Sequence, residues 1–270
     1  MPAQLLVINP NTSASVSATL LELALREAAG QCQVRVQTAR LGASYISDEV
    51  SFAIAGHALL DAYAFDKAQP GQQPPDAVLI ACFGDPGLLA LRQLSDAPVL
   101  GLAQASMQAA HEAASPRARY AVITGGQAWV PMLQRLAVQL GLDDRLAAIR
   151  AVEKTGAQLA ANPQAAVREL ADLCEQLLAK EASLQTILLG GAALGGLAQP
   201  IQALLRERGL DEVVLMDSVT HSLRMAVTQA QAFATQRLAH SAAAPSVLST
   251  SVSASNLSPE LQSLLAHPRP

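Results

Sequence analysis

The sequence predicts an α/β fold of two pseudo-symmetric lobes, each with a parallel sheet, and an active site in the cleft between them. Short apolar runs alternate with longer Ala- and Leu-rich stretches, a pattern that is typical of βαβ units. The order of strand, loop and helix start then repeats in the second half of the chain. Two matching Gly-rich segments, ACFGDPGL at Ala81–Leu88 and LLGGAALGGLA at Leu188–Ala198, follow equivalent predicted strands in the two halves.

The individual elements follow from the spacing of apolar residues. Short uninterrupted apolar runs indicate buried strands, whereas apolar residues that recur every three or four positions indicate helices. The predicted strands are Leu5–Ile8, Val34–Thr38, Ala77–Ile80, Val99–Gly101, Tyr120–Ile123, Thr186–Leu189 and Val213–Met216. The predicted helices are Ser13–Ala29, Ser51–Ala64, Gln104–Ala114, Trp129–Leu140, Pro163–Lys180 and Pro200–Arg208.

Three pairs of segments support a duplication: LLVINPNTS with YAVITGGQAW, AVLIACFGDPGL with TILLGGAALGGLA, and PVLGLAQAS with EVVLMDSVTHS. We expect residues 1–100 and 212–238 to form the first lobe and residues 101–211 to form the second. Residues 239–270 are rich in Ser, Ala and Pro, and we expect a tail that is poorly ordered or packed loosely on the outside. Its one helical signal is Ser258–Ala266, where Ser-Pro-Glu is typical of a helix start.

The composition excludes several classes of protein. Charged residues make up 15% of the chain, the formal net charge is −4 and the Lys and Arg residues are scattered, so we expect no nucleic-acid partner. No apolar stretch reaches the roughly 18–20 residues that span a bilayer and no basic leader precedes the first strand, so we expect a cytoplasmic protein without membrane contact. The 3 cysteines lie far apart without zinc-ligand spacing, which predicts free thiols and no metal site.

Cys82 is the candidate nucleophile or base. It ends a predicted strand and precedes Phe-Gly-Asp-Pro-Gly, where the N-terminus of a helix can depress the pKa of a thiol. A buried structural cysteine is the alternative interpretation. Asp85 either orients this loop or forms a simple Asp-Pro-Gly turn. Cys32 and Cys174 have no comparable surroundings in the sequence.

Polar residues follow the first strand of each predicted lobe. Asn11 and Thr12 lie just before a helix, where side chains and backbone amides can hold a carboxylate or imide oxygen, or can simply cap the helix. Thr124 and Gly125 hold the matching place in the second lobe. His221 follows the last strand, and its imidazole is either a general acid or base or a solvent-exposed residue at a helix start.

Taken together, the segments INPNTS, ACFGDPGL, LLGGAALGGLA and LMDSV resemble the aspartate/glutamate/hydantoin racemase superfamily, most closely its hydantoin and allantoin racemase branch. The resemblance implies two Rossmann-like lobes that hold a small-molecule substrate between two cysteines, without metal, nucleotide or pyridoxal phosphate, and hence no cofactor. One thiolate removes a proton from the stereocentre and the other thiol delivers one to the opposite face. Cys82 matches the first cysteine, and Asn11 and Thr12 match ligand-contact positions. We also expect a homo-oligomer.

The chain departs from the family pattern on the side of the second lobe. The second cysteine of the family falls on Gly191, a usual threonine falls on Gly125, and a small residue falls on His221. We also expect Phe83, Gly84, Gly191 and Ala192 to contact the substrate. Loss of one positioned acid or base lowers a rate by about 10²–10⁴-fold, so the missing thiol bears directly on the reaction.

Three functions are compatible with a single cysteine. The sequence favours a lyase or hydrolase that acts on a hydantoin-like five-membered ring, for example a thiohydantoin desulfhydrase in which Cys82 attacks the C2 thiocarbonyl carbon, hydrogen sulfide leaves and hydrolysis gives the hydantoin. The first alternative is a hydantoin or allantoin racemase with a substitute second base, either His221 or a water. The second alternative is a ligand-binding descendant without catalytic activity.

Overall fold

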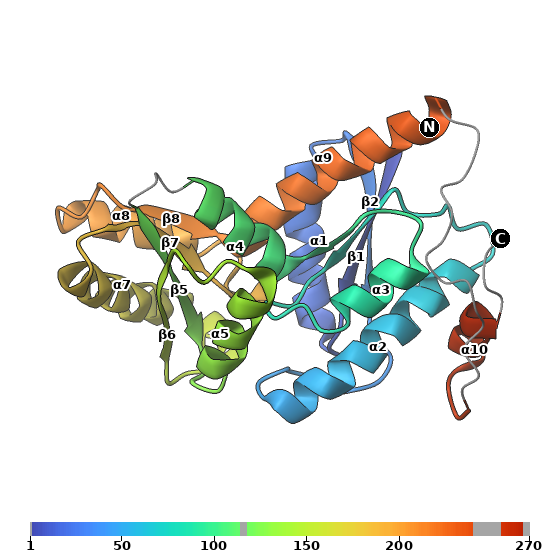
Figure 1. The fold of residues 1–270 in the computed structure, drawn as a ribbon, viewed down its shortest axis with the longest axis horizontal. Coiled ribbons are helices and arrows are strands. Elements are labelled where there is room, and N and C mark those ends of the chain that lie inside the picture. The colour runs from blue at the N-terminus through green and yellow to red at the C-terminus, as the bar shows by residue number, and fades with distance from the viewer. Residues whose placement is uncertain (1, 114–117, 240–254, 267–270) are drawn as a thin grey trace.

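The computed structural model describes residues 2–113, 118–239 and 255–266 and confirms an α/β fold with two parallel sheets (Figure 1). Each sheet contains four strands. The first has the order β2-β1-β3-β4, with β1 (Ala3–Asn9), β2 (Cys32–Thr38), β3 (Ala77–Ile80) and β4 (Val99–Gly101). The second has the order β6-β5-β7-β8, with β5 (Arg119–Gly125), β6 (Leu146–Val152), β7 (Leu184–Leu189) and β8 (Val214–Asp217). The identical strand order is the pseudo-symmetry that the sequence predicts.

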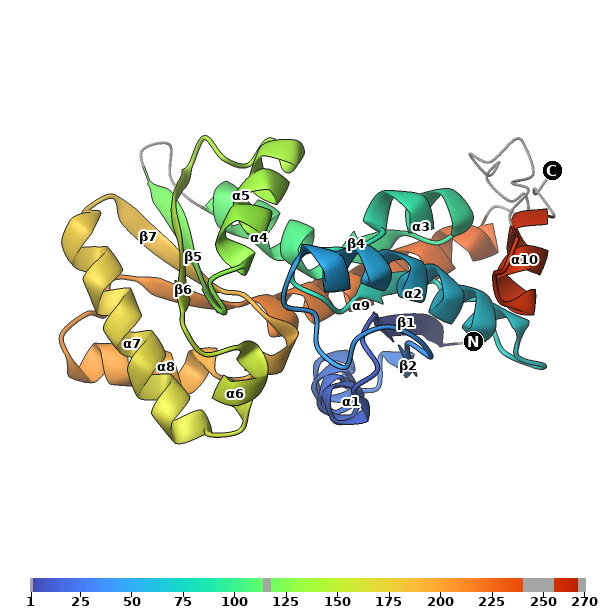
Figure 2. The ribbon, with the colours of Figure 1, turned by 90° about the horizontal axis from the view of Figure 1, so that it is seen from below.

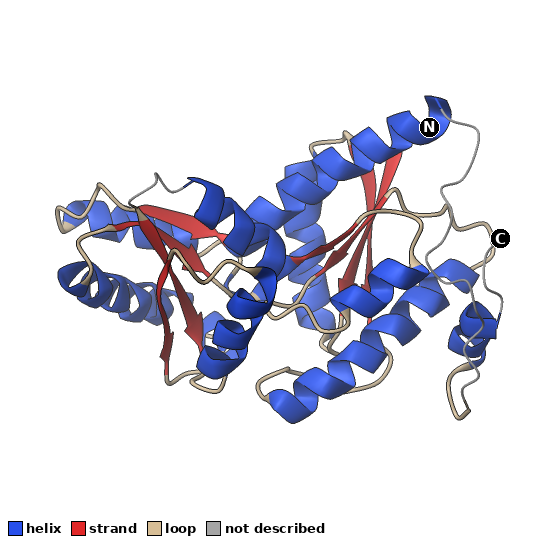
Figure 3. Cartoon of the chain, in the orientation of Figure 1, coloured by secondary structure: helices blue, strands red, loops and turns tan. Residues whose placement is uncertain are grey.

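Helices cover both faces of the first sheet (Figure 3). The helices of this lobe are α1 (Ala14–Ala28), α2 (Glu49–Ala68), α3 (Leu88–Leu94) and α9 (Ser218–Ala239). Leu5 of β1 belongs to a buried apolar cluster with residues of α1 and α9, whereas Leu6 belongs to a second cluster with residues of α2 and α3. Because neighbouring side chains of a strand point to opposite faces, the middle of β1, from Leu5 to Ile8, is apolar without interruption.

The second sheet is covered in the same way. Its helices are α4 (Leu102–Ala113), α5 (Trp129–Leu140), α6 (Gly156–Ala160), α7 (Pro163–Lys180) and α8 (Ala198–Glu207), with a short 3₁₀ helix at Ala192–Leu194. Val122 of β5 packs on the side of α4 and α5, whereas Ile123 packs with residues of α7 and α8. The cluster that contains Val122 is continuous with the α1 and α9 side of the first lobe, so the two lobes share one apolar core near α4 and α9 (Figure 2).

The chain crosses between the lobes at two places. The first crossing is direct, because β4 ends at Gly101 and α4 begins at Leu102. The second crossing lies between β8 and α9. We expected residues 212–238 to belong to the first lobe, but this is wrong for β8, which pairs with β7 in the second sheet. Only α9 returns to the first lobe, where it packs on α1, β1 and β3. Val214–Asp217 form an edge strand of the second sheet because β7 offers them a free side to pair with.

The sequence analysis missed α3, β6, α6 and the short 3₁₀ helix, and it anticipated only the start of α9, near His221. The helical signal in the tail is confirmed by α10 (Pro259–Ala266), but this helix is not loosely packed. Leu261 is 2% exposed, and the helix lies against α2 (Figure 1). The expectation for residues 240–254 and 267–270 lies outside the described residues. Along the described part of the chain, no helix combines the length and the apolar character that a membrane crossing requires.

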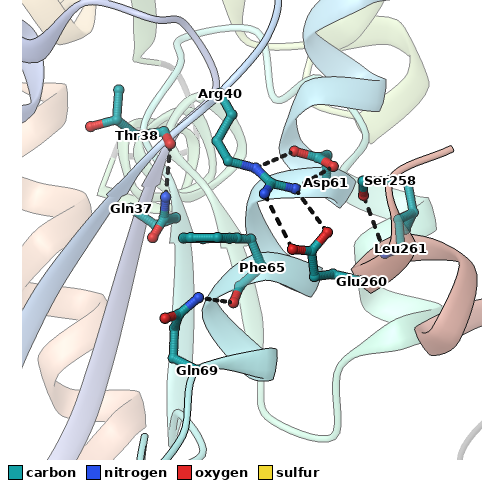
Figure 4. A network of polar contacts seen from close by, with 9 residues as sticks. All are labelled: Gln37, Thr38, Arg40, Asp61, Phe65, Gln69, Ser258, Glu260 and Leu261. Carbon is teal, nitrogen blue, oxygen red and sulfur yellow. Dashed lines mark hydrogen bonds and ion pairs between the residues drawn. The ribbon is translucent and has the colours of Figure 1, made fainter.

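An ion-pair network joins α10 to α2 (Figure 4). Arg40 donates to both oxygens of Asp61, at 3.0 and 2.9 Å, and also to Glu260, at 3.4 and 3.2 Å. The Asp61 side chain is only 1% exposed, whereas that of Glu260 is 26% exposed. Burial alone would raise the pKa of Asp61, but hydrogen bonds from Arg40 and Ser258 bring it below its ordinary value. The buried charge of Asp61 therefore needs Arg40 as its partner more than the more exposed charge of Glu260 does.

Two variants should separate these contributions. Arg40→Ala leaves Asp61 buried without its cation, and breaking a buried pair costs about 3–5 kcal/mol, with the partial exposure of Arg40 favouring the lower end. Glu260→Gln removes only the more exposed pair and should change the free energy of unfolding by less than about 1 kcal/mol. Urea unfolding measures both values. An equal decrease in the free energy of unfolding in both variants would contradict the larger role of the Arg40–Asp61 pair.

Candidate active site

A pocket lies between the lobes, at the carboxyl ends of the two central strands of each sheet. The space inside it, including the solvent at its open mouth, is about 500 Å³. This is the place at which open α/β sheets bind ligands. The first-lobe wall comes from residues after β1 and β3 and from the loop before α2, and the second-lobe wall comes from the ends of β5 and β7 and from the starts of α5 and α6. The lining residues are Asn11, Val16, Tyr45, Ile46, Ala81, Cys82, Phe83, Thr124, Trp129, Gly156, Gly190, Gly191, Ala192, Ala193 and Leu194.

Cys82 lines the first-lobe wall, and its side chain is almost completely buried, with 7% of the residue exposed. Its carbonyl accepts the N–H groups of Gly84 and Asp85, which close a tight turn. Burial raises the pKa of the Cys82 thiol above its ordinary value, and the nearby Asp85 carboxyl raises it further. The expectation of a depressed pKa is therefore wrong for this structure, because burial of the thiol raises its pKa and the Asp85 carboxyl adds to this effect, while α3 begins only at Leu88.

Asp85 orients the loop that carries Cys82. Its buried carboxylate accepts the N–H groups of Ala103 at 2.9 Å and Gln104 at 2.7 Å, in the first turn of α4. Gly101 leaves room for it, because an added Cβ there would collide with the carboxylate. Burial raises the pKa of Asp85 to about 7, although these hydrogen bonds act in the opposite direction. Of the two roles open for Asp85, the structure supports the orienting one.

The INPNTS segment presents an amide to the pocket. Asn11 lines the pocket, and its Oδ1 accepts from Asn9 Nδ2 at 3.0 Å and from the N–H of Ser13 at 2.9 Å. Among the described residues, Asn11 Nδ2 has no protein partner, so it can donate to a ligand. Thr12 lies outside the pocket lining, and its N–H donates to the carbonyl of Ala43. Thr12 therefore ties this segment to the loop before α2.

The second-lobe wall follows β5 and β7. Thr124 lines it and donates its hydroxyl proton to the carbonyl of Gly190 at 2.7 Å. Gly191, where the resemblance expects the second cysteine, has φ +138°, a conformation that side chains rarely adopt. An added Cβ would have room, since its nearest neighbour, the Leu194 side chain, would lie at 3.5 Å. The backbone at Gly191 thus opposes a cysteine more strongly than the available space does.

Of the sequence-predicted residues, Asn11, Cys82, Phe83, Thr124, Gly191 and Ala192 meet in the pocket, and Thr12, Gly84, Gly125 and His221 do not line it. Gly84 and Gly125 lie directly behind the walls. A Cβ on Gly84 would come within 2.6 Å of the Trp129 ring, and one on Gly125 within 2.8 Å of the Lys154 carbonyl. Both glycines therefore permit close packing.

His221 lies in the first turn of α9, away from the pocket lining. Its Nε2 is buried and has no hydrogen-bond partner among the described residues. Burial lowers the pKa of His221, and Arg224 lowers it further, so the ring is neutral at pH 7. Its position makes it a poor choice for the second base.

The sequence analysis missed Tyr45 and Ile46, which lie in the loop before α2. The Tyr45 hydroxyl accepts the N–H of Gly156, the first residue of α6 in the second lobe, at 2.8 Å. Nothing in the local pattern LGASYISDEV marks a pocket residue, because the contact joins residues 111 positions apart. The described residues contain no cluster of three or more His, Cys, Asp or Glu side chains that could hold a metal ion.

Residues 5–226 match the Asp/Glu/Hydantoin racemase family. The chain is 30% identical over 220 residues to a hydantoin racemase of Rhizobium meliloti, which covers 82% of this chain and 86% of that protein. It is 28% identical over 220 residues to a hydantoin racemase of Paenarthrobacter aurescens, with 82% and 90% covered. An allantoin racemase from Klebsiella pneumoniae has a similar structure, with a TM-score of 0.77 at 27% identity over 97% of this chain and 98% of that one.

The surroundings of Cys82 predict how fast it reacts with iodoacetamide. Because burial and Asp85 raise the thiol pKa above the ordinary value of about 8.5, the alkylation rate should still be rising at pH 9. Asp85→Asn removes a negative charge beside the thiol and should accelerate alkylation at pH 8 by up to about tenfold, which corresponds to one pKa unit. Site-resolved mass spectrometry distinguishes Cys82 from Cys32 and Cys174. A plateau below pH 8 would contradict the raised pKa.

Proposed function

Since the chain belongs to the Asp/Glu/hydantoin racemase family, we propose that it racemises a 5-substituted hydantoin-like ring, with Cys82 as one of the two proton-transfer groups. The observation that supports this most strongly is the position of Cys82, buried on the wall of a pocket between the two lobes. The hydantoin racemases among its relatives match it over most of their length.

The pocket offers what such a reaction needs. The C5 hydrogen of a hydantoin lies next to the C4 carbonyl, so its removal gives a planar enolate whose charge is carried by oxygen. A thiol with a raised pKa ionises less often, but its thiolate is then a stronger base. The Asn11 amide can donate a hydrogen bond to the developing oxyanion, and such donors stabilise the transition state most when water is excluded. Ile46, Phe83 and Trp129 supply apolar walls for the substituent.

This proposal replaces the thiohydantoin reaction that the sequence favoured. That interpretation depended on the absence of a thiol at Gly191, and none of the relatives described above carries such an activity in its name. Racemisation was the alternative, and the relatives fit it better. It requires a second proton-transfer group, because inversion needs one group on each face of the ring.

The proposal is tested with both enantiomers of 5-benzylhydantoin and of allantoin, followed by polarimetry. The wild type should abolish the optical rotation of at least one of these compounds. Cys82→Ala should slow this by about 10²–10⁴-fold, the usual contribution of a positioned acid or base. Cys174→Ala is the matched control, because Cys174 is also buried but lies on α7, in the apolar core of the second lobe.

Other products would contradict the proposal. Release of hydrogen sulfide from a thiohydantoin, or ring opening, without racemisation of any hydantoin would favour the lyase or hydrolase. Tight binding of a hydantoin without any turnover would favour a ligand-binding protein.

A further inference from the structure

We infer that the Tyr45 hydroxyl is the second proton-transfer group of this site and acts from the wall opposite Cys82. The inference rests on the proposed racemisation, which needs proton removal at one face of the substrate and delivery at the other. The resemblance expects a thiol for this role, at the position that Gly191 occupies in this chain.

Tyr45 connects the two lobes at the pocket. The residue belongs to the first lobe, but its hydroxyl contacts α6 of the second lobe. Its hydroxyl accepts the N–H of Gly156 at 2.8 Å, and a Cβ added to Gly156 would lie 2.7 Å from that hydroxyl and 3.5 Å from Cβ of Ala193. Although its backbone belongs to the first lobe, the Tyr45 hydroxyl therefore lies at the second-lobe side of the pocket, beside Gly156 and close to Ala193.

Few side chains that line the pocket can exchange a proton. Among the lining residues that the structure describes, only Cys82 and Tyr45 have side chains that ionise. Thr124 has a hydroxyl, but its proton is donated to the carbonyl of Gly190. His221 lies outside the lining. Within the pocket, Tyr45 is thus the group that can replace a thiol.

The hydrogen bonds of Tyr45 suit a proton donor. Its oxygen accepts a backbone N–H, and within the described chain its own proton has no protein acceptor. Burial raises the pKa of Tyr45 above its ordinary value, so the phenol is protonated at neutral pH. After the proton leaves, the tyrosinate keeps hydrogen bonds from the backbone N–H groups of Gly156 and Ala157, which lower that pKa and stabilise the anion.

The protons balance in both directions. The Cys82 thiolate takes the C5 proton of one enantiomer and becomes a thiol, and Tyr45 donates its proton to the opposite face of the enolate and becomes a tyrosinate. For the other enantiomer, the tyrosinate removes the proton and the thiol donates one. In the free enzyme, the Cys82 thiol then releases a proton to solvent and the Tyr45 tyrosinate takes one up, which restores the first form.

Tyr45→Phe tests this most sharply, because it keeps the ring and removes only the hydroxyl. In deuterium oxide, the variant should lose racemisation by about 10²–10⁴-fold. It should still exchange the C5 hydrogen of one enantiomer for deuterium with retention of configuration, since Cys82 can remove and return a proton at its own face. Polarimetry and proton NMR of the same samples give both rates.

The matched control is Tyr120→Phe, which removes a buried hydroxyl that donates to the Leu142 carbonyl outside the pocket lining. This variant should racemise at the wild-type rate. Wild-type racemisation in Tyr45→Phe would overturn the inference and leave the proposed function intact. Loss of both racemisation and exchange in a folded Tyr45→Phe protein would also overturn it, because the hydroxyl would then serve binding or positioning. Absence of racemisation in the wild type itself would contradict the proposed function instead.

Discussion

The candidate site depends on the buried Asp85 carboxylate, which joins the Cys82 loop to the first turn of α4. Two backbone N–H groups of α4 bind this carboxylate, and the positive end of a helix dipole favours a negative charge there. Burial opposes that charge and raises the pKa of Asp85 to about 7. Because α4 packs on the second lobe while the loop belongs to the first, this contact fixes the thiol relative to both walls of the pocket.

The pseudo-symmetry of the fold does not extend to the chemistry of the site. Both sheets have the same strand order and both present a Gly-rich loop after an equivalent strand, but only the first loop holds a thiol. The backbone at Gly191 has a conformation that favours glycine, and Tyr45 from the first lobe reaches the neighbouring surface. A two-fold arrangement of strands thus holds two different ionisable groups.

The fold could be predicted from the sequence more completely than the site. Strands β1, β3, β5 and β7 are buried on both faces, so each contains an apolar run, whereas β6 is a partly exposed edge strand in which Arg150 interrupts the apolar residues LAAI and AV. Cys82 and Asn11 could be found because local motifs surround them. Tyr45 could not be found, because its contact with Gly156 spans 111 positions and forms only when the two lobes come together.

A crystal structure with a bound 5-substituted hydantoin would test the central claim most directly, by measuring where C5 lies between the two walls. Reacting atoms in a productive complex lie about 3–3.5 Å apart. We predict Cys82 Sγ and Tyr45 Oη at about this distance from C5, on opposite faces of the ring. A complex with both atoms on one face, or with Tyr45 turned away from C5, would contradict proton transfer between these two residues.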